Sequence, residues 1–187
     1  MIYILPTDTC YWIACPIHDL KSYSWIYKIK KRDLGKPLAI LVPDFKWLEE
    51  NTDLNKEQVL FLKDYEKPFT ILSNSDSLKI WINYVDDDNN EFSNRDLYET
   101  FAFRVVNNDI ERRLVKENGP MFLTSANLSN KPELYKWKEV EEEFSYYLEK
   151  DKIVFVWKNT WNLPEKWTSD IFQFTWEDLD VEYKRKN

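Results

Sequence analysis

Short apolar runs alternate with longer segments of helical spacing along almost the whole chain. Apolar residues spaced like Leu20, Tyr23, Ile26 and Tyr27 predict an amphipathic helix, whereas short dense apolar runs predict buried strands. Helices are predicted at residues 20–31, 45–50, 56–65, 109–117 and 140–150. Strands are predicted at residues 2–5, 10–15, 37–42, 68–72, 78–85, 100–106, 121–124, 153–156 and 170–174. Because both kinds of element recur throughout, the sequence predicts an α/β fold in which helices flank a mixed sheet.

The connections between these elements show no sign of a domain boundary. The Asn118–Gly119–Pro120 segment predicts the end of a helix, and residues 86–90 form an acidic loop. No repeat or low-complexity linker interrupts the pattern, and 187 residues suit one domain, taken here as 1–187. From about Tyr183 the chain is polar, which predicts a frayed C-terminal tail.

The charge balance argues against a protein that binds nucleic acid only through its overall charge. The formal net charge is −7, whereas such binders are usually basic because they neutralise phosphates. One basic run stands out, formed by Lys28, Lys30, Lys31, Arg32 and Lys36. It predicts a local anion site, with the solvated face of a helix as the alternative.

Other features set the expected environment. No stretch approaches the ~20 apolar residues of a membrane helix, and the start of the chain lacks the pattern of a signal peptide. The two cysteines, Cys10 and Cys15, cannot form a zinc site with the single histidine, His18, at ordinary spacing. We therefore expect a cytoplasmic protein with reduced thiols, no membrane contact and no metal held by its own side chains.

Three short segments carry most of the functional information. They are Pro-Thr-Asp-Thr-Cys-Tyr at 6–11, Lys-Lys-Arg at 30–32 with Lys-Pro-Leu at 36–38, and Thr-Ser-Ala-Asn-Leu-Ser at 124–129. Pro-Phe-Thr at 68–70, Ala-Phe-Arg-Val at 102–105 and Ser-Asp-Ile at 169–171 follow the same order. The segments from 6 to 129 resemble the YrdC/Sua5 family of threonylcarbamoyl-AMP synthases in its short single-domain form, over residues 2 to about 132. Ser-Asp-Ile at 169–171 is a weaker match to a late segment of that family.

The resemblance implies a fold, a reaction and partners. The fold is a twisted open sheet with a concave cationic surface. The reaction is a nucleotidyl transfer in which L-threonine, bicarbonate or CO₂ and ATP, with Mg²⁺, give threonylcarbamoyl-AMP and pyrophosphate. A separate threonylcarbamoyl transferase complex then modifies adenosine 37 of tRNA to t6A. A different class of function stays open, which is a non-catalytic protein of the same fold that binds nucleotide or double-stranded RNA at a basic groove.

The basic residues suit this chemistry. Attack on the α-phosphorus of ATP requires positively charged groups at fixed positions more than it requires a covalent nucleophile on the protein. Arginine offers a fork to phosphate oxygens and lysine a point charge. Lys30 and Arg32 are therefore expected to be catalytic and to bind ATP, and Lys36 is assigned to the carboxylate of threonine or to the phosphates. The alternative is a solvated helix end that interacts with the helix dipole.

Small polar residues are expected to complete the site. A polar cluster after a strand lies where open α/β sheets bind ligands, although the same residues could cap a helix or form a turn. On the resemblance, ATP is assigned Thr124, Ser125, Asn127, Ser129, Ser169 and Arg104. Threonine is assigned Thr9 and Tyr11, with core packing as the alternative for Tyr11. Arg104 lies on a predicted apolar strand, where an unpaired charge is costly, so it needs an anionic ligand or an internal carboxylate as partner. Asp8 is expected to cap a turn, with the binding of a metal-bridging water as the alternative.

Glycine is scarce, with only Gly35 and Gly119, while tryptophan occurs nine times. Asn130 replaces the glycine that ends the Thr-Ser-Ala-Asn motif in the family, and asparagine can take a positive φ at modest cost. Trp12, Trp157 and Trp161 fall roughly where relatives have glycine. We hypothesise that these three codons are UGA, read as glycine by the source organism. The alternative is an AT-rich genome that has lost GC-rich glycine codons. UGG codons at these positions would refute the hypothesis.

Overall fold

The computed structural model describes residues 1–79, 83–85, 91–93, 96, 98–148, 153–156, 162–165, 168–175 and 179–186. The expected acidic loop at 86–90 lies outside these residues, as do Trp157, Trp161 and part of the strand expected at 78–85. None of the helices in the described part combines the length and the apolar character that crossing a bilayer requires.

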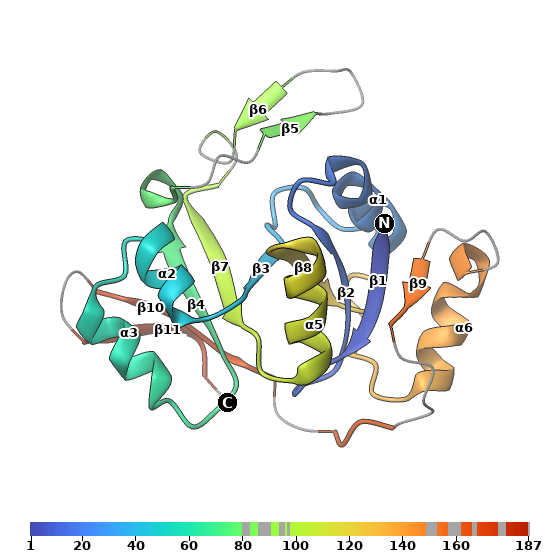
Figure 1. Cartoon of the computed structure of the whole chain (residues 1–187). Coiled ribbons are helices and arrows are strands. Elements are labelled where there is room, and N and C mark those ends of the chain that lie inside the picture. Colours follow the sequence, from blue (N-terminus) through green and yellow to red (C-terminus); the bar gives the residue numbers. More distant parts are fainter. Residues whose placement is uncertain are drawn as a thin grey trace.

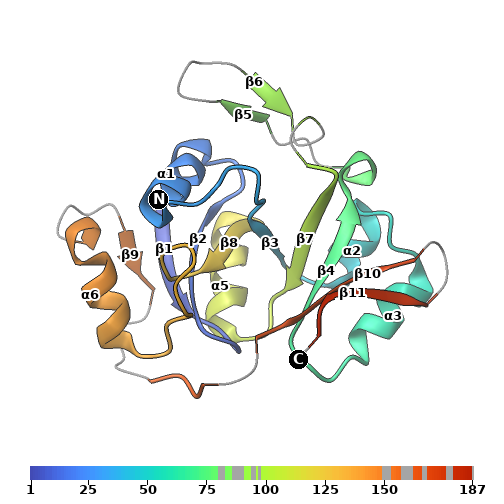
Figure 2. The same cartoon turned by 180° about the vertical axis from the view of Figure 1, so that it is seen from behind.

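A nine-stranded mixed sheet forms the centre of the fold, as Figure 1 and Figure 2 show from opposite sides. Its strand order is β11-β10-β4-β7-β3-β8-β2-β1-β9. The strands are β1 (Ile2–Pro6), β2 (Tyr11–Pro16), β3 (Ala39–Val42), β4 (Phe69–Asn74), β7 (Thr100–Val105), β8 (Met121–Ser125), β9 (Ile153–Phe155), β10 (Asp170–Phe174) and β11 (Val181–Arg185). The pairs β1–β9, β3–β7 and β4–β10 are parallel and the others are antiparallel. The short strands β5 (Asn83–Val85) and β6 (Glu91–Ser93) pair with each other apart from this sheet.

Helices cover both faces of the sheet. They are α1 (Leu20–Lys30), α2 (Phe45–Asn51), α3 (Lys56–Lys63), α5 (Asp109–Asn118) and α6 (Trp137–Leu148). The larger core cluster contains residues of α1, α2, α3 and α6, whereas Leu114 and Val115 of α5 pack in a second cluster. In β2, Ile13 belongs to the first cluster and Ala14 to the second, as expected for side chains that alternate across a strand. The helix α5 therefore covers the opposite face, and it crosses in front of the sheet in Figure 1.

Local sequence explains where most helices begin. Asp19, Asp44, Asn55 and Asn108 are the N-cap residues of α1, α2, α3 and α5, and each side chain accepts a hydrogen bond from a backbone N–H of the first turn. Such caps satisfy amides that have no partner within the helix. The helix α5 ends at Gly119, whose φ is 74°. The predicted stop at Asn118–Gly119–Pro120 is thus confirmed.

The predicted architecture of a twisted open mixed sheet with flanking helices is confirmed. The predicted frayed tail from Tyr183 is wrong, because Val181–Arg185 forms β11 and pairs antiparallel with β10. Alternation explains why, since Val181 and Tyr183 pack against the core while Glu182 and Lys184 are exposed. Asn130 has a φ of 68°, so asparagine does take a left-handed conformation there.

Candidate functional site

A cavity of about 230 Å³ lies on the sheet face that α5 covers. Ala39 of β3, Leu123 of β8 and Trp12 of β2 line the cavity and also pack in the α5-side cluster. Among the predicted site residues, those that line it are Thr9, Arg32, Thr124, Ser125 and Ser169. Five residues predicted from four separate segments are thus brought together.

Lys30 and Arg32, the two predicted catalytic residues, lie on either side of a turn that ends α1. Lys31 has a left-handed conformation with a φ of 51°, and the backbone N–H of Arg32 donates to the carbonyl oxygen of Tyr27 at 2.9 Å. This turn resembles the helix ends that usually hold glycine at the left-handed position. Arg32, which follows this turn, reaches the cavity, whereas Lys30, the last residue of α1, is buried on the same helix face as Ile26 and Tyr27.

The ammonium group of Lys30 lies beneath the loop that follows β8. Only 1% of Lys30 is exposed, and its Nζ donates to the carbonyl oxygens of Ser125 and Asn127. It does not line the cavity. Burial, together with the nearby charge of Arg32, lowers the pKa of Lys30 from 10.5 to about 7. The expected contact with the triphosphate stays a prediction, while the contacts present give Lys30 a positioning role.

Arg32 is held by the loop that contains Lys36. Its Nε donates to the carbonyl oxygen of Lys36 at 3.1 Å, and its Nη2 donates to that of Pro37 at 3.0 Å. The hydroxyl of Tyr27 also donates to the Lys36 carbonyl, and that of Tyr98 donates to the Leu34 carbonyl. The Lys36 side chain is exposed and does not line the cavity, so its contact with substrate stays a prediction.

The Thr-Ser-Ala-Asn loop is tied to itself and to α1. The Ser125 hydroxyl donates to Asn127 Oδ1, and Asn127 Nδ2 donates to the Lys131 carbonyl. The backbone N–H of Ser129 donates to the Lys30 carbonyl at 2.9 Å. Thr124 and Ser125 line the cavity, whereas Asn127 is buried and shapes the loop. The buried hydroxyl of Ser129 has no hydrogen-bond partner among the described residues.

Arg104 has the internal carboxylate that was one of its two expected partners. Its Nη2 donates to Asp8 Oδ1 at 2.6 Å, and Asn107 Nδ2 donates to Asp8 Oδ2 at 2.9 Å. Asp8 thus joins the turn after β1 to the end of β7. The Trp12 ring stacks on the guanidinium group, with Cζ 4.7 Å from its centroid. Tyr11 lies in the core, with its ring centroid 6.1 Å from that of Trp137, and does not line the cavity.

Sequence reasoning missed Arg185. A bulge in β11 pairs Arg185 with Ile171 and Tyr183 with Phe172, so that two steps along β11 match one step along β10. This shift turns Arg185 toward the cavity, where its Nη2 donates to the Ser169 hydroxyl at 3.2 Å. The Thr70 hydroxyl lies 3.1 Å from the same oxygen atom. The arginine could be read from the sequence, but the bulge could not.

Glu133 was also missed, and it is the only carboxylate among the described residues that line the cavity. Its charge raises the pKa of Cys10, although burial is the larger cause, and together they bring that pKa to about 11. A thiol with such a pKa is protonated at neutral pH and is a poor nucleophile. The cavity therefore offers guanidinium groups, hydroxyls and one carboxylate, which suits the binding of an anion better than covalent catalysis.

The network around Asp8 leads to a testable prediction about pH. Glu111 of α5 is buried, and it accepts a hydrogen bond from the Asn107 backbone N–H at 2.7 Å. Burial raises its pKa from 4.5 to about 7. Because the pKa is higher in the folded state, the stability that Glu111 contributes is full below about pH 4.5 and is lost as the pH rises through 7.

We expect Glu111→Gln, which keeps an acceptor for the Asn107 N–H, to remove this loss. As the pH rises from 5 to 8, the melting temperature of the variant should rise relative to that of the wild type. The corresponding gain in the free energy of unfolding is at most roughly 3 kcal/mol. The matched control is Glu117→Gln, because Glu117 is an exposed carboxylate of the same helix. A constant difference between Glu111→Gln and wild type across this range would contradict the prediction.

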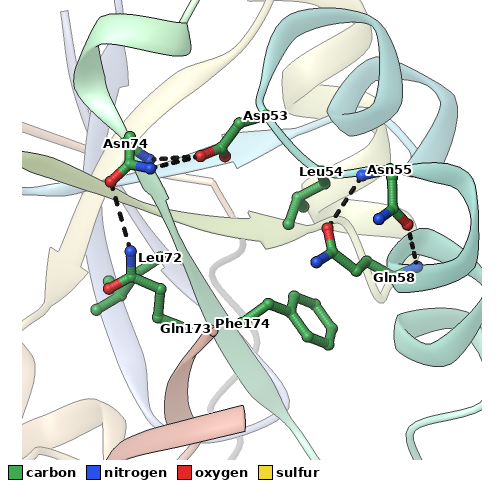
Figure 3. Close-up of a pocket in the computed structure, with 8 residues that line it drawn as sticks. All are labelled: Asp53, Leu54, Asn55, Gln58, Leu72, Asn74, Gln173 and Phe174. Atoms are coloured by element: carbon green, nitrogen blue, oxygen red, sulfur yellow. Dashed lines mark hydrogen bonds between the residues drawn. The ribbon is translucent and has the colours of Figure 1, made fainter. Parts of the chain in front are cut away.

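A second hollow, of about 510 Å³, lies between the start of α3 and the ends of β4 and β10 (Figure 3). Its polar side chains bond mainly to one another. Asn74 Nδ2 donates to Asp53 Oδ2 at 2.7 Å, and Gln173 Nε2 lies 3.5 Å from Asn74 Oδ1. None of the described residues that line this hollow is basic. The smaller cavity, with Arg32 and Arg185, is therefore the better candidate for binding phosphate.

Comparison with known proteins identifies one family and several solved structures of similar fold. A model of the Sua5/YciO/YrdC family, described as telomere recombination, matches residues 1–176. No curated protein sequence matches the chain. The fold is similar to that of P. abyssi Sua5 in complex with L-threonine, with 20% identity, a TM-score of 0.71, and coverage of 98% of this chain and 49% of that one. This chain thus spans about half the length of that relative.

Two further structures have the same fold. E. coli YciO gives a TM-score of 0.69 at 20% identity and covers 99% of this chain and 82% of its own. Full-length HypF in a phosphate- and nucleotide-bound form gives 0.70 at 20% identity, with 92% of this chain and 25% of that one covered.

Proposed function

The chain belongs to the Sua5/YciO/YrdC family, and on that premise we propose that it is an L-threonylcarbamoyladenylate synthase. As a nucleotidyltransferase it joins L-threonine, bicarbonate or CO₂ and ATP into threonylcarbamoyl-AMP and releases pyrophosphate. The observation that supports this most is the convergence of Arg32 and Arg185 on one cavity lined by hydroxyl groups. The product then passes to a separate transferase complex that makes t6A at position 37 of tRNA.

The residues take complementary roles in this proposal. The two guanidinium groups hold the phosphates and stabilise the charge that develops as pyrophosphate leaves. The hydroxyls of Thr9, Ser125 and Ser169 offer hydrogen bonds to threonine and to the nucleotide. P. abyssi Sua5 binds L-threonine and HypF binds nucleotide, and these bound states support the same ligand classes for this chain.

Mg²⁺ enters in this proposal together with ATP. Mg²⁺ is commonly held by one or two carboxylates plus substrate phosphates, and it keeps several waters. One carboxylate, Glu133, lines the cavity, so the donor set fits a metal that the substrate brings. The bound metal neutralises charge on the phosphates.

The test is threonine-dependent release of pyrophosphate. The purified protein is mixed with ATP, Mg²⁺ and bicarbonate, with L-threonine present or omitted. Release that requires both threonine and bicarbonate supports the synthase, and mass spectrometry should detect threonylcarbamoyl-AMP. No such release from a folded protein would favour the alternative of a nucleotide- or RNA-binding protein. We place that alternative second because Lys30, in the middle of the basic run, is buried and unavailable to RNA.

A further inference from the structure

Trp12 and Arg104 form a stacked pair between the cavity and another hollow, which lies at the end of β7. Trp12 lines the cavity of about 230 Å³, and Arg104 does not. Arg104 instead lines a neighbouring hollow of about 460 Å³ together with Asp8 and Asn107. Because the indole ring covers the guanidinium group at 4.7 Å, the pair lies between the two spaces.

The indole of Trp12 is held in place by burial and by a hydrogen bond. It is 9% exposed, and its Nε1 donates to the Thr9 hydroxyl at 3.1 Å. This hydroxyl is one of those assigned to substrate, so the ring occupies space beside it and also uses it as an acceptor. Trp12 is not among the described residues with positive φ. The backbone at position 12 therefore does not require glycine, and a residue with a side chain can stand there without strain from a positive φ.

The guanidinium group behind the ring has unused donor capacity. Arg104 is 6% exposed and its Nη2 bonds to Asp8, but its Nη1 is buried without a hydrogen-bond partner among the described residues. A buried N–H without a partner is unusual. The present cavity is also smaller than the roughly 300–1,000 Å³ of most sites for small molecules. Both observations indicate a larger site that the indole ring divides.

We propose that residue 12 is a specificity-determining residue, whose side chain sets the size of the anion that the cavity accepts. With Trp12 in place the cavity holds a small anion such as pyrophosphate at Arg32 and Arg185 and binds a nucleoside triphosphate weakly. With a small residue at position 12 the cavity extends to Arg104 and binds the nucleoside triphosphate more tightly. The choice of ligand rests on the proposed function.

The test compares the binding of two probes by calorimetry, ATP with Mg²⁺ and inorganic pyrophosphate. We expect Trp12→Gly to bind ATP at least ~10-fold more tightly than wild type, with pyrophosphate affinity changed by less than ~3-fold. Trp12→Phe, which keeps a ring at this position, is the matched control and should behave as wild type. If Trp12→Gly does not fold, Trp12→Val keeps a residue that favours strands and serves the same purpose.

Equal ATP affinities of wild type and Trp12→Gly would overturn the inference, as would the absence of ATP binding in both. Tighter binding of ATP by Trp12→Phe would overturn it too, because this variant keeps a ring at position 12 and the inference expects a gain only when the ring is lost. The proposed function is judged separately, by threonine-dependent pyrophosphate release. A variant that binds ATP more tightly without such release would support the role of residue 12 and contradict the synthase.

Discussion

Lys30→Met is expected to reduce threonine-dependent pyrophosphate release by roughly 100-fold, because misplacing a site by about 1 Å can cost that much. The lysine ammonium donates to the carbonyl oxygens of Ser125 and Asn127, and it lies 3.5 Å from Asn127 Oδ1. Methionine has a similar shape but no donor. The two carbonyls then lose their buried partner, at a cost of about 1–3 kcal/mol each. The loop should move, and Ser125, which lines the cavity, moves with it.

The measurement separates positioning from folding. Circular dichroism at the assay temperature checks that Lys30→Met is folded, and titration with L-threonine and ATP separates kcat from KM. The matched control is Lys21→Met on the exposed face of the same helix, which should keep full activity. If Lys30→Met is folded and releases pyrophosphate at the wild-type rate, the positioning role is wrong.

The pKa of Lys30 adds a second readout. Burial lowers it from 10.5 to about 7, so between these values the unfolded chain binds more protons than the folded one. The stability of the wild type relative to Lys30→Met should therefore rise with pH across this window. Urea unfolding at pH 7 and pH 9 measures the difference. A purely apolar role for the side chain predicts no such change.

Local pattern was enough to predict most elements and the segments that meet at the cavity. The apolar spacing of α1, the helix stop at Gly119 and the polar cluster at the end of β8 depend on residues close together in sequence. The side-chain contacts depend on more. Lys30 lies on the buried face of α1 with Ile26 and Tyr27, but the carbonyl oxygens that accept from its ammonium group belong to a loop far away in sequence.

Long-range contacts explain the other differences between the predicted site and the site in the structure. The partner of Arg104 is Asp8, far away in sequence, and their contact requires β1 and β7 to lie on the same sheet with their ends close together. The role of Arg185 depends on one extra residue in the pairing of β11 with β10. Trp12 presents a different case. If its codon is a UGA read as glycine, Trp12→Gly is the natural protein, and the cavity then has the larger size inferred above.

Arg32→Ala should lower kcat for pyrophosphate release by roughly 10²–10³-fold, the usual cost of removing a donor placed at developing charge. Two of the five guanidinium donors hold the carbonyls of Lys36 and Pro37, which fixes the direction of the group. Arg32 also lines the cavity where we propose that the phosphates bind. Alanine removes both the charge and the link to the loop.

Arg32→Lys distinguishes these two losses. Lysine restores a positive charge, but its single ammonium cannot bond to two carbonyls and also offer a fork to phosphate. We therefore expect Arg32→Lys to recover less than about a tenth of the lost rate, which is the behaviour of a group that acts by geometry as well as by charge. The control is Arg112→Ala, whose guanidinium is exposed and pairs only with Asp109 among the described residues. Full activity of Arg32→Lys would show that a positive charge at this point is sufficient, and full activity of Arg32→Ala would remove Arg32 from the site.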